Sequence, residues 1–229
     1  MDILLSDLFL LTLTVALYCG GQVLYRLTRT PLLHPVLLTF LAMIAFLKLT
    51  GIDYERYREA TSILDFVLGM SVVALGYLMY EQSEHIRGNV TAILGAVVTG
   101  CVVGIGSVVG IAVAMGADRT ILTSIAPKSV TVPIAVSVAE PLGGIAAVTS
   151  VVVFLVGIFG SIAGVWILDL CGVRLPQARG LALGSAAHGI GTARAVEMGA
   201  VEGALSGLAI ALMGIATALA APLFEKFVY

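Results

Sequence analysis

The run Ala126-Pro127-Lys128-Ser129-Val130-Thr131-Val132-Pro133 sets one cation and two hydroxyls between two prolines, inside sequence that is otherwise apolar. A helix does not continue normally between two prolines, so backbone N–H and C=O groups are freed next to the Lys128 ammonium. A cation with free backbone donors beside it is suited to binding an anion. The sequence therefore predicts an interrupted helix and an anion site at this point.

The surroundings of this run are predicted to be a lipid bilayer. Of the 229 residues, 59% are hydrophobic and 11% are charged, and the mean hydropathy is +1.09. A membrane-spanning helix needs about 20 apolar residues, and six such segments are expected, near 8–24, 32–49, 63–80, 90–115, 142–168 and 205–224. The first has no basic n-region and no small-residue cleavage site, so it is expected to be a retained span. The chain is predicted to be an all-α integral membrane protein with a single domain over residues 1–229.

Several classes of function find no support in the sequence. A net charge of −2 gives no reason to expect a nucleic-acid partner. Cys19, Cys101 and Cys171 are single and widely spaced, so neither a disulfide framework nor a metal site is expected. There is no phosphate-binding loop, no H-E-x-x-H and no G-x-S-x-G motif. We therefore expect no catalysis and no cofactor, and any transport would be secondary or would belong to a larger complex.

Two further segments, 120–139 and 181–199, are apolar but interrupted by Pro, Gly, charged and hydroxyl residues. They are predicted to be broken helices or re-entrant helical hairpins. Residues 124–131 also align weakly with 185–192, which suggests an internal repeat of the kind many transporters carry. If both hairpins are re-entrant the repeat is inverted, and if both segments cross fully it is parallel.

The candidate site residues come from these two segments. Lys128 is predicted to bind a carboxylate, with Ser129 and Thr131 as further donors, although membrane hydroxyls often bond only to their own backbone. In the second segment, Arg194 offers a planar fork for a carboxylate and His188 titrates near neutral pH, which suits proton coupling. The alternatives are a snorkelling lysine or arginine and a packing histidine.

Three glutamates are candidates for a coupling-ion site. Glu140, Glu197 and Glu202 either bind a coupling cation or pair with Arg194 and Lys128, and pairing is the favoured interpretation.

Small residues four apart predict close helix packing. The pairs are Gly100/Gly104, Gly106/Gly110, Gly160/Gly164 and Gly203/Gly207. Packing within one subunit is favoured over a dimer contact. The distribution of Lys and Arg slightly favours an external N-terminus.

Two motifs resemble those of the LrgB/CidB family. They are Pro127-Lys128-Ser129-Val130-Thr131-Val132-Pro133-Ile134-Ala135 and His188-Gly189-Ile190-Gly191-Thr192-Ala193-Arg194-Ala195. The resemblance extends over essentially the whole chain. By this resemblance Lys128, Ser129, Thr131, His188, Thr192 and Arg194 are expected to bind substrate. Met70 and Leu78 stand where the family usually has prolines, so a third broken helix is not expected.

The resemblance implies a multi-pass protein of the bacterial inner membrane. Family members are described as holin/antiholin-like regulators of murein hydrolase activity and autolysis, with a small LrgA/CidA-like membrane partner, and a homo-oligomer is expected. Plant relatives are plastid glycolate/glycerate translocators, and bacterial members have been tied to pyruvate. The leading hypothesis is a carrier for a small 2-oxo or 2-hydroxy monocarboxylate. The alternatives are a holin-like oligomer without carrier activity and a regulatory subunit that is inert without its partner.

Overall fold

The computed structural model describes residues 6–28, 33, 35–81, 84 and 87–228. Within these residues every regular element is a helix. The chain divides into two compact units, residues 1–74 and 75–229, and the division falls inside helix α4 (Ser62–Glu81). Helix α4 is unbroken through positions 70 and 78, as the absence of proline there predicts.

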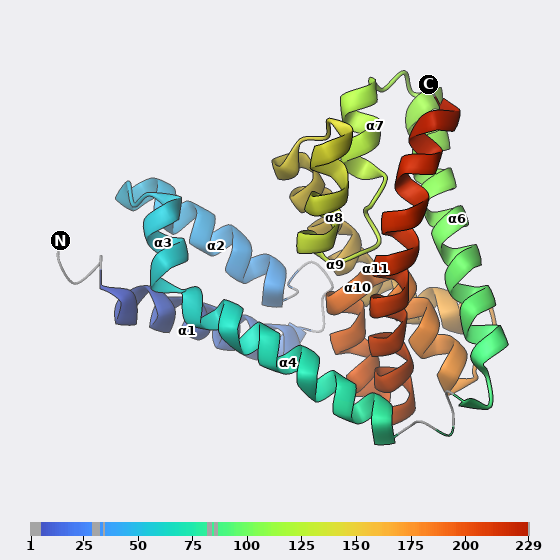
Figure 1. Cartoon of the computed structure of the whole chain (residues 1–229). Coiled ribbons are helices and arrows are strands. Elements are labelled where there is room, and N and C mark those ends of the chain that lie inside the picture. Colours follow the sequence, from blue (N-terminus) through green and yellow to red (C-terminus); the bar gives the residue numbers. More distant parts are fainter. Residues whose placement is uncertain (1–5, 29–32, 34, 82–83, 85–86, 229) are drawn as a thin grey trace. The chain divides into compact units, whose positions relative to one another are not determined.

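The first unit is built on helices α1 (Asp7–Thr28), α2 (Pro35–Thr50) and α3 (Tyr54–Ala60) (Figure 1). Helix α1 contacts both of the others. An ion pair between Arg56 and Asp7 joins the start of α1 to α3. The hydroxyls of Thr14 and Tyr57 lie 3.2 Å apart and join the same two helices.

The second unit contains the long helices α6 (Val90–Ala114), α9 (Ala146–Leu170), α10 (Pro176–Met198) and α11 (Ala200–Val228). The short helices α7 (Arg119–Ile125), α8 (Val132–Ala139) and η2 (Glu140–Leu142) lie between α6 and α9 in the sequence. Figure 1 shows α6 and α11 running side by side.

The predicted interruption at residues 126–131 is present. Asp118 caps the start of α7 by accepting a 2.8 Å hydrogen bond from the Ile121 N–H. Helix α7 then ends at Ile125, because Pro127 has no N–H with which to continue the ladder. The chain resumes as α8, which has Pro133 in its first turn, where a missing N–H costs nothing.

After this break the chain folds back. Leu122 and Ala126 pack on α6, and the Ser129 hydroxyl lies 3.6 Å from the Cβ that a residue at position 104 would carry. The chain then returns through α8 to Gly144, where an added Cβ would lie 3.1 Å from the Ser124 backbone nitrogen. Residues 119–144 therefore form a hairpin with its tip opposite the middle of α6.

A second break lies inside α10. Ala187 and His188 leave helical geometry, and His188 has φ 41° and ψ −133°, a region that residues with a Cβ rarely occupy. A Cβ at Gly191 would lie 2.6 Å from the Leu183 carbonyl oxygen, whereas eight residues of continuous helix would separate them by about 12 Å. The second half of α10 therefore returns beside the first half, and both predicted interruptions are confirmed as hairpins of the chain.

Glycines bring the second hairpin against its neighbours. A Cβ at Gly160 would lie 2.4 Å from the Ala187 Cβ, and one at Gly164 would lie 2.8 Å from Leu183. The predicted packing of Gly160 and Gly164 within one subunit is thus confirmed. On a neighbouring face of α10, a Cβ at Gly184 would lie 2.3 Å from the Ser206 carbonyl oxygen of α11.

These contacts fix the directions of the helices. The first half of α10 is antiparallel to α9, because residues 183 and 187 face 164 and 160 in reverse order. It is parallel to α11, because Gly180 faces Glu202 and Gly184 faces Ser206. Helices α9 and α11, each of which is next to a hairpin, therefore run in opposite directions.

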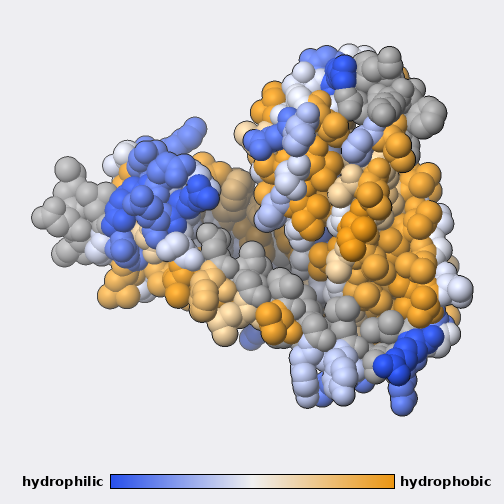
Figure 2. All heavy atoms as spheres, viewed as in Figure 1, coloured by the Kyte–Doolittle hydropathy of each residue, from blue (hydrophilic) through white to orange (hydrophobic). Residues whose placement is uncertain are grey.

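Four helices are long and apolar enough to cross a membrane among the described residues: α1, α6, α9 and α11. Helix α2 is apolar but has only 16 residues, and α4 is not among the four, so the predicted count of six spans is not confirmed. Figure 2 shows apolar side chains over the middle of α6 and α11, with hydrophilic residues toward the ends of α6. The chain is a multi-pass membrane protein.

Candidate functional site

The tip of the first hairpin carries Lys128 and Ser129. The Lys128 Nζ donates a 3.0 Å hydrogen bond to the Ser129 Oγ. Ser129 is buried and Lys128 is half-buried. Thr131 begins α8 at its N-cap position without a side-chain capping bond, and it is half-buried. The hairpin therefore holds an ammonium group and a hydroxyl together at the middle of α6.

These two residues line a cavity of about 870 Å³ between α6 and the first half of α10. Its wall on α6 includes Gly95, Ala96, Thr99, Gly100, Val103 and Gly104, and its wall on α10 includes Gln177, Ala178, Leu181, Ala182, Ser185 and Ala186. Asn89 and Leu175, which precede the two helices, also line it. The cavity therefore extends from the starts of α6 and α10 to the tip of the first hairpin.

The wall is largely apolar, with a small number of polar groups. Lys128 is the one lining residue that carries a charge among those described. Ser185 lies beside α6, with its Cβ 3.6 Å from the Cβ that a residue at position 100 would carry. Its Oγ is buried. Among the described residues, it is the buried side-chain nitrogen or oxygen atom that has no hydrogen-bond partner. An apolar cavity with few polar groups at one end is typical of a binding site for a small molecule.

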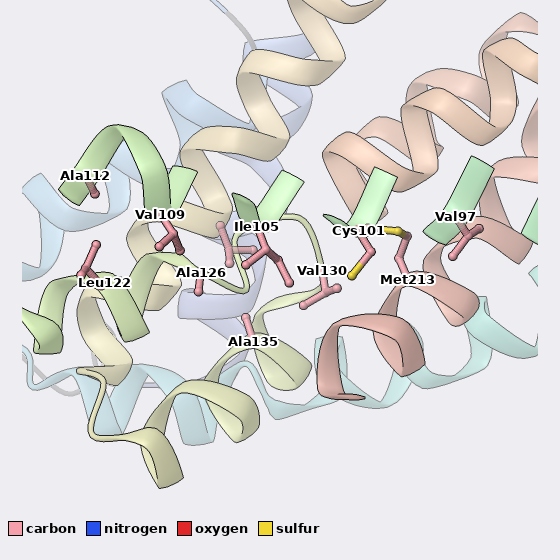
Figure 3. Close-up of a cluster of buried hydrophobic side chains, with 11 residues drawn as sticks. Val97, Cys101, Ile105, Val109, Ala112, Leu122, Ala126, Val130, Ala135 and Met213 are labelled. Atoms are coloured by element: carbon pink, nitrogen blue, oxygen red, sulfur yellow. The ribbon is translucent and has the colours of Figure 1, made fainter. Parts of the chain in front are cut away.

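Beyond the tip, α6 is packed tightly against the first hairpin. Figure 3 shows the buried side chains of this cluster, in which Ile105, Val109 and Ala112 lie against the hairpin and Val97 and Cys101 lie near Met213 of α11. The α6 members are Val97, Cys101, Ile105, Val109 and Ala112. Ile105, Val109 and Ala112 lie between the hairpin tip and the C-terminal end of α6. The described cavity thus reaches the tip from the end where α6 begins, and apolar packing fills the other direction.

The tip of the second hairpin has a different environment. His188 is buried, and its Nε2 donates a 2.9 Å hydrogen bond to the Val153 carbonyl of α9. A Cβ at Gly157 would lie 2.6 Å from the imidazole, so this ring packs directly on the α9 backbone. The hydroxyls of Thr192 and Ser206 are both buried and lie 2.7 Å apart. Neither His188 nor Thr192 is among the residues that line the cavity.

Arg194 lies on an exposed face of α10. Its Nη1 donates a 2.7 Å hydrogen bond to the Glu197 carboxylate, and the two side chains are 43% and 66% exposed. The structure thus pairs Arg194 with one of the predicted glutamates, and it does not bring the guanidinium together with Lys128 at the cavity.

The other two glutamates lie apart from Lys128. Glu140 is exposed at the start of η2. Glu202 lines a second cavity of about 600 Å³ with Asp169, Arg174, Arg179 and Met198. Arg179 there pairs with Asp169 and donates a 3.0 Å hydrogen bond to the Val173 carbonyl. No group of three or more His, Cys, Asp or Glu side chains within the described ranges is arranged to hold a metal ion.

Ser185, Thr99 and Gln177 line the cavity but were not predicted from the sequence as site residues. Thr99 and Gln177 are isolated polar residues in helical sequence, and nothing in the pattern distinguishes them. Ser185 could have been noticed in the sequence, because the repeat alignment pairs it with Ser124. Ser124 has a structural role, since it accepts a 2.8 Å hydrogen bond from the Ile145 N–H at the start of α9.

The fold and the cavity together define a multi-pass helical membrane protein with two interrupted helices and a largely apolar cavity at one hairpin tip. The model of the LrgB-like family matches residues 14–227, and the chain belongs to this family. It is 36% identical over 216 residues to the uncharacterized protein YxaC of Bacillus subtilis, covering 94% of each chain. It is 31% identical to the holin-like protein CidB of Staphylococcus aureus, covering 97% of each chain, and 29% identical to the antiholin-like protein LrgB of Bacillus mycoides, covering 98% of each. No solved structure matches.

Proposed function

We propose that this chain is a secondary carrier that moves small monocarboxylates, of the pyruvate and glycolate class, across the bacterial inner membrane. The observation that carries the proposal is the Lys128 ammonium at the tip of an interrupted helix, in the wall of a cavity that is otherwise nearly free of charge. A charged lysine at the centre of a bilayer is costly, by at least about 2.5 kcal/mol. A bound carboxylate would offset that cost by supplying the opposite charge.

The rest of the cavity suits a small anion. Ser129, which already accepts a hydrogen bond from Lys128, can donate its own proton to a carboxylate oxygen. The apolar walls exclude water and strengthen the ammonium–carboxylate attraction. By the family resemblance Thr131, His188 and Thr192 remain predicted substrate residues, although none of them lines the cavity. Arg194, which the resemblance also predicts, is exposed and paired with Glu197, so its part in binding is tested separately below.

The direction of the helices supports a transport cycle. The two hairpins start from opposite ends of the second unit, and α9 and α11 run in opposite directions. In our interpretation, each hairpin together with the long helix that follows it belongs to one half of an inverted repeat. The chain then has six spans in all, and both hairpins are re-entrant. Access from one end in this conformation would alternate with access from the other when the hairpins move.

The proposal is tested by uptake of radiolabelled pyruvate and glycolate into proteoliposomes, with and without a pH gradient. The carrier proposal predicts uptake that saturates with substrate. Linear uptake equal to that of protein-free vesicles would contradict it.

A substitution of Arg194 tests whether uptake depends on the Arg194 guanidinium as well as on the Lys128 ammonium. We expect Arg194→Ala to lower stability by less than about 1 kcal/mol, because the ion pair it breaks is exposed. Uptake is expected to stay close to the native rate, because the guanidinium does not line the cavity. Arg58→Ala, which breaks another exposed pair three residues apart, is the matched control. Loss of saturable uptake in Arg194→Ala alone would place Arg194 at the substrate.

The names of the relatives favour a second candidate function. Relatives at 29–31% identity are named holin-like and antiholin-like proteins. In this alternative the chain is an oligomeric membrane regulator of murein hydrolase export, which acts with an LrgA/CidA-like partner and has no carrier activity. Release of a large encapsulated dye from vesicles would support this function, whereas dye retention together with saturable uptake supports the carrier.

A further inference from the structure

We propose that Ser185 is the specificity-determining residue of the cavity, which selects acids that carry an oxygen on carbon 2 over acids that do not. The inference rests on the proposed carrier function and adds the second polar contact of the substrate. The Lys128 ammonium binds the carboxylate, and the Ser185 hydroxyl donates a hydrogen bond to the 2-oxo or 2-hydroxy oxygen. Unsubstituted acids such as acetate and propionate leave that hydroxyl without a partner.

The first observation behind this inference is the hydrogen bonding of hydroxyls on helices. In this protein they generally donate to the carbonyl three or four residues earlier. Examples are Thr14 to Leu10, Thr123 to Arg119, Ser124 to Thr120 and Ser150 to Ala146. Ser185 departs from this pattern, because its buried Oγ has no partner at all among the described residues. A buried donor without a partner is unfavourable, so a ligand that supplies an acceptor would relieve it.

The second observation is the position of Ser185. It lines the same cavity as Lys128 and Ser129. Its Cβ approaches α6 at Gly100, and the Ser129 Oγ approaches α6 at Gly104, one helical turn further on. Side chains four residues apart on a helix are about 5–6 Å from each other. The side chains of Ser185 and Ser129 therefore face successive turns of α6. The distance between them suits an acid of two or three carbons.

The Ser185 hydroxyl needs only a rotation about χ1 to turn toward the cavity, because serine has a single side-chain torsion before its hydroxyl. It is a donor and an acceptor, so it can pair with a ketone oxygen or with a hydroxyl. A site built to hydrogen-bond a substrate oxygen rejects the analogue that lacks it more strongly than an apolar pocket rejects a change of size.

The test compares acids of equal charge and carbon number as competitors of radiolabelled pyruvate uptake in proteoliposomes. The pairs are lactate with propionate and glycolate with acetate. In the native protein the 2-hydroxy acid of each pair should inhibit at a concentration at least about tenfold lower. In Ser185→Ala this ratio should fall to within about threefold. Ser150→Ala, which removes a hydroxyl bonded to its own helix, should keep the native ratio.

Thermal unfolding of the same variants separates selectivity from structure. Ser185→Ala should unfold at the native temperature or above it, because no hydrogen bond is lost. An unchanged ratio in Ser185→Ala, or no preference in the native protein, would overturn the inference while saturable uptake left the carrier proposal standing. Absence of saturable uptake by the native protein would instead overturn the carrier proposal and this inference with it.

Discussion

Lys128→Ala is expected to reduce uptake of pyruvate and glycolate to that of protein-free vesicles. The substitution removes the one charged group of the described cavity lining and leaves a carboxylate without a counter-charge in an apolar environment. A hydrogen bond to a charged group contributes about 1.5–3 kcal/mol, so affinity alone should fall at least about tenfold. The measurement is initial uptake rate against substrate concentration.

Two controls make the result interpretable. Lys48→Ala removes an exposed lysine from the last turn of α2 and should keep native uptake. Lys128→Ala should insert and unfold like the native protein, because the ammonium donates to the neighbouring Ser129 and joins no distant element through that bond. Native uptake by a correctly inserted Lys128→Ala variant would remove the ammonium from the mechanism.

Gly184→Ala is expected to cause a large loss of stability for so small a change. The new Cβ would lie 2.3 Å from the Ser206 carbonyl oxygen and 2.8 Å from its Cα, and a backbone cannot move aside as a flexible side chain can. Overpacking of this kind typically costs about 1–3 kcal/mol, and we expect about 2 kcal/mol or more. The loss should appear as a lower unfolding temperature in detergent and a smaller folded fraction.

Gly110→Ala is the matched control for this prediction. Nothing lies within 4 Å of a Cβ at Gly110, so alanine should be neutral or slightly stabilising through its higher helix propensity. Equal unfolding temperatures for the Gly184 and Gly110 variants would contradict the close contact of α10 with α11.

The interrupted helices could be predicted because their cause is local. Pro127 and Pro133 stop and start a helix through the chemistry of their own backbone, and the break lies between them. Lys128 stood out because a cation is rare in apolar sequence. Both features depend on residue type alone, and neither depends on which other helix lies nearby.

The positions of the site residues in α10 could not be predicted in the same way. Arg194 and His188 were chosen for their chemistry, but the reversal at His188 turns the residues after it back along α10. His188 then packs against α9, and Arg194 faces outward to Glu197. Ser185, which precedes the reversal, lies at the cavity instead. A sequence pattern does not reveal the direction of a chain after such a reversal.

Close helix packing could be predicted in part, because the four-residue spacing of glycines is visible in the sequence. The pair Gly160 and Gly164 was identified from its spacing, and its contact with α10 lies within one chain. Gly180 and Gly184 have the same spacing and make even closer contacts with α11, yet they lie in a segment whose interruptions dominate its sequence pattern. Spacing shows that two helices can approach closely, and the partner helix becomes known only from the structure.

In the proposed mechanism Lys128 holds a small carboxylate at the tip of the first hairpin. Equilibrium binding of radiolabelled pyruvate to the detergent-purified protein tests it most directly, because binding requires neither a membrane gradient nor a partner protein. We predict saturable binding by the native protein and by Lys48→Ala, and binding that is at least about tenfold weaker by Lys128→Ala. Equal binding by native protein and Lys128→Ala, or no saturable binding by either, would contradict the claim.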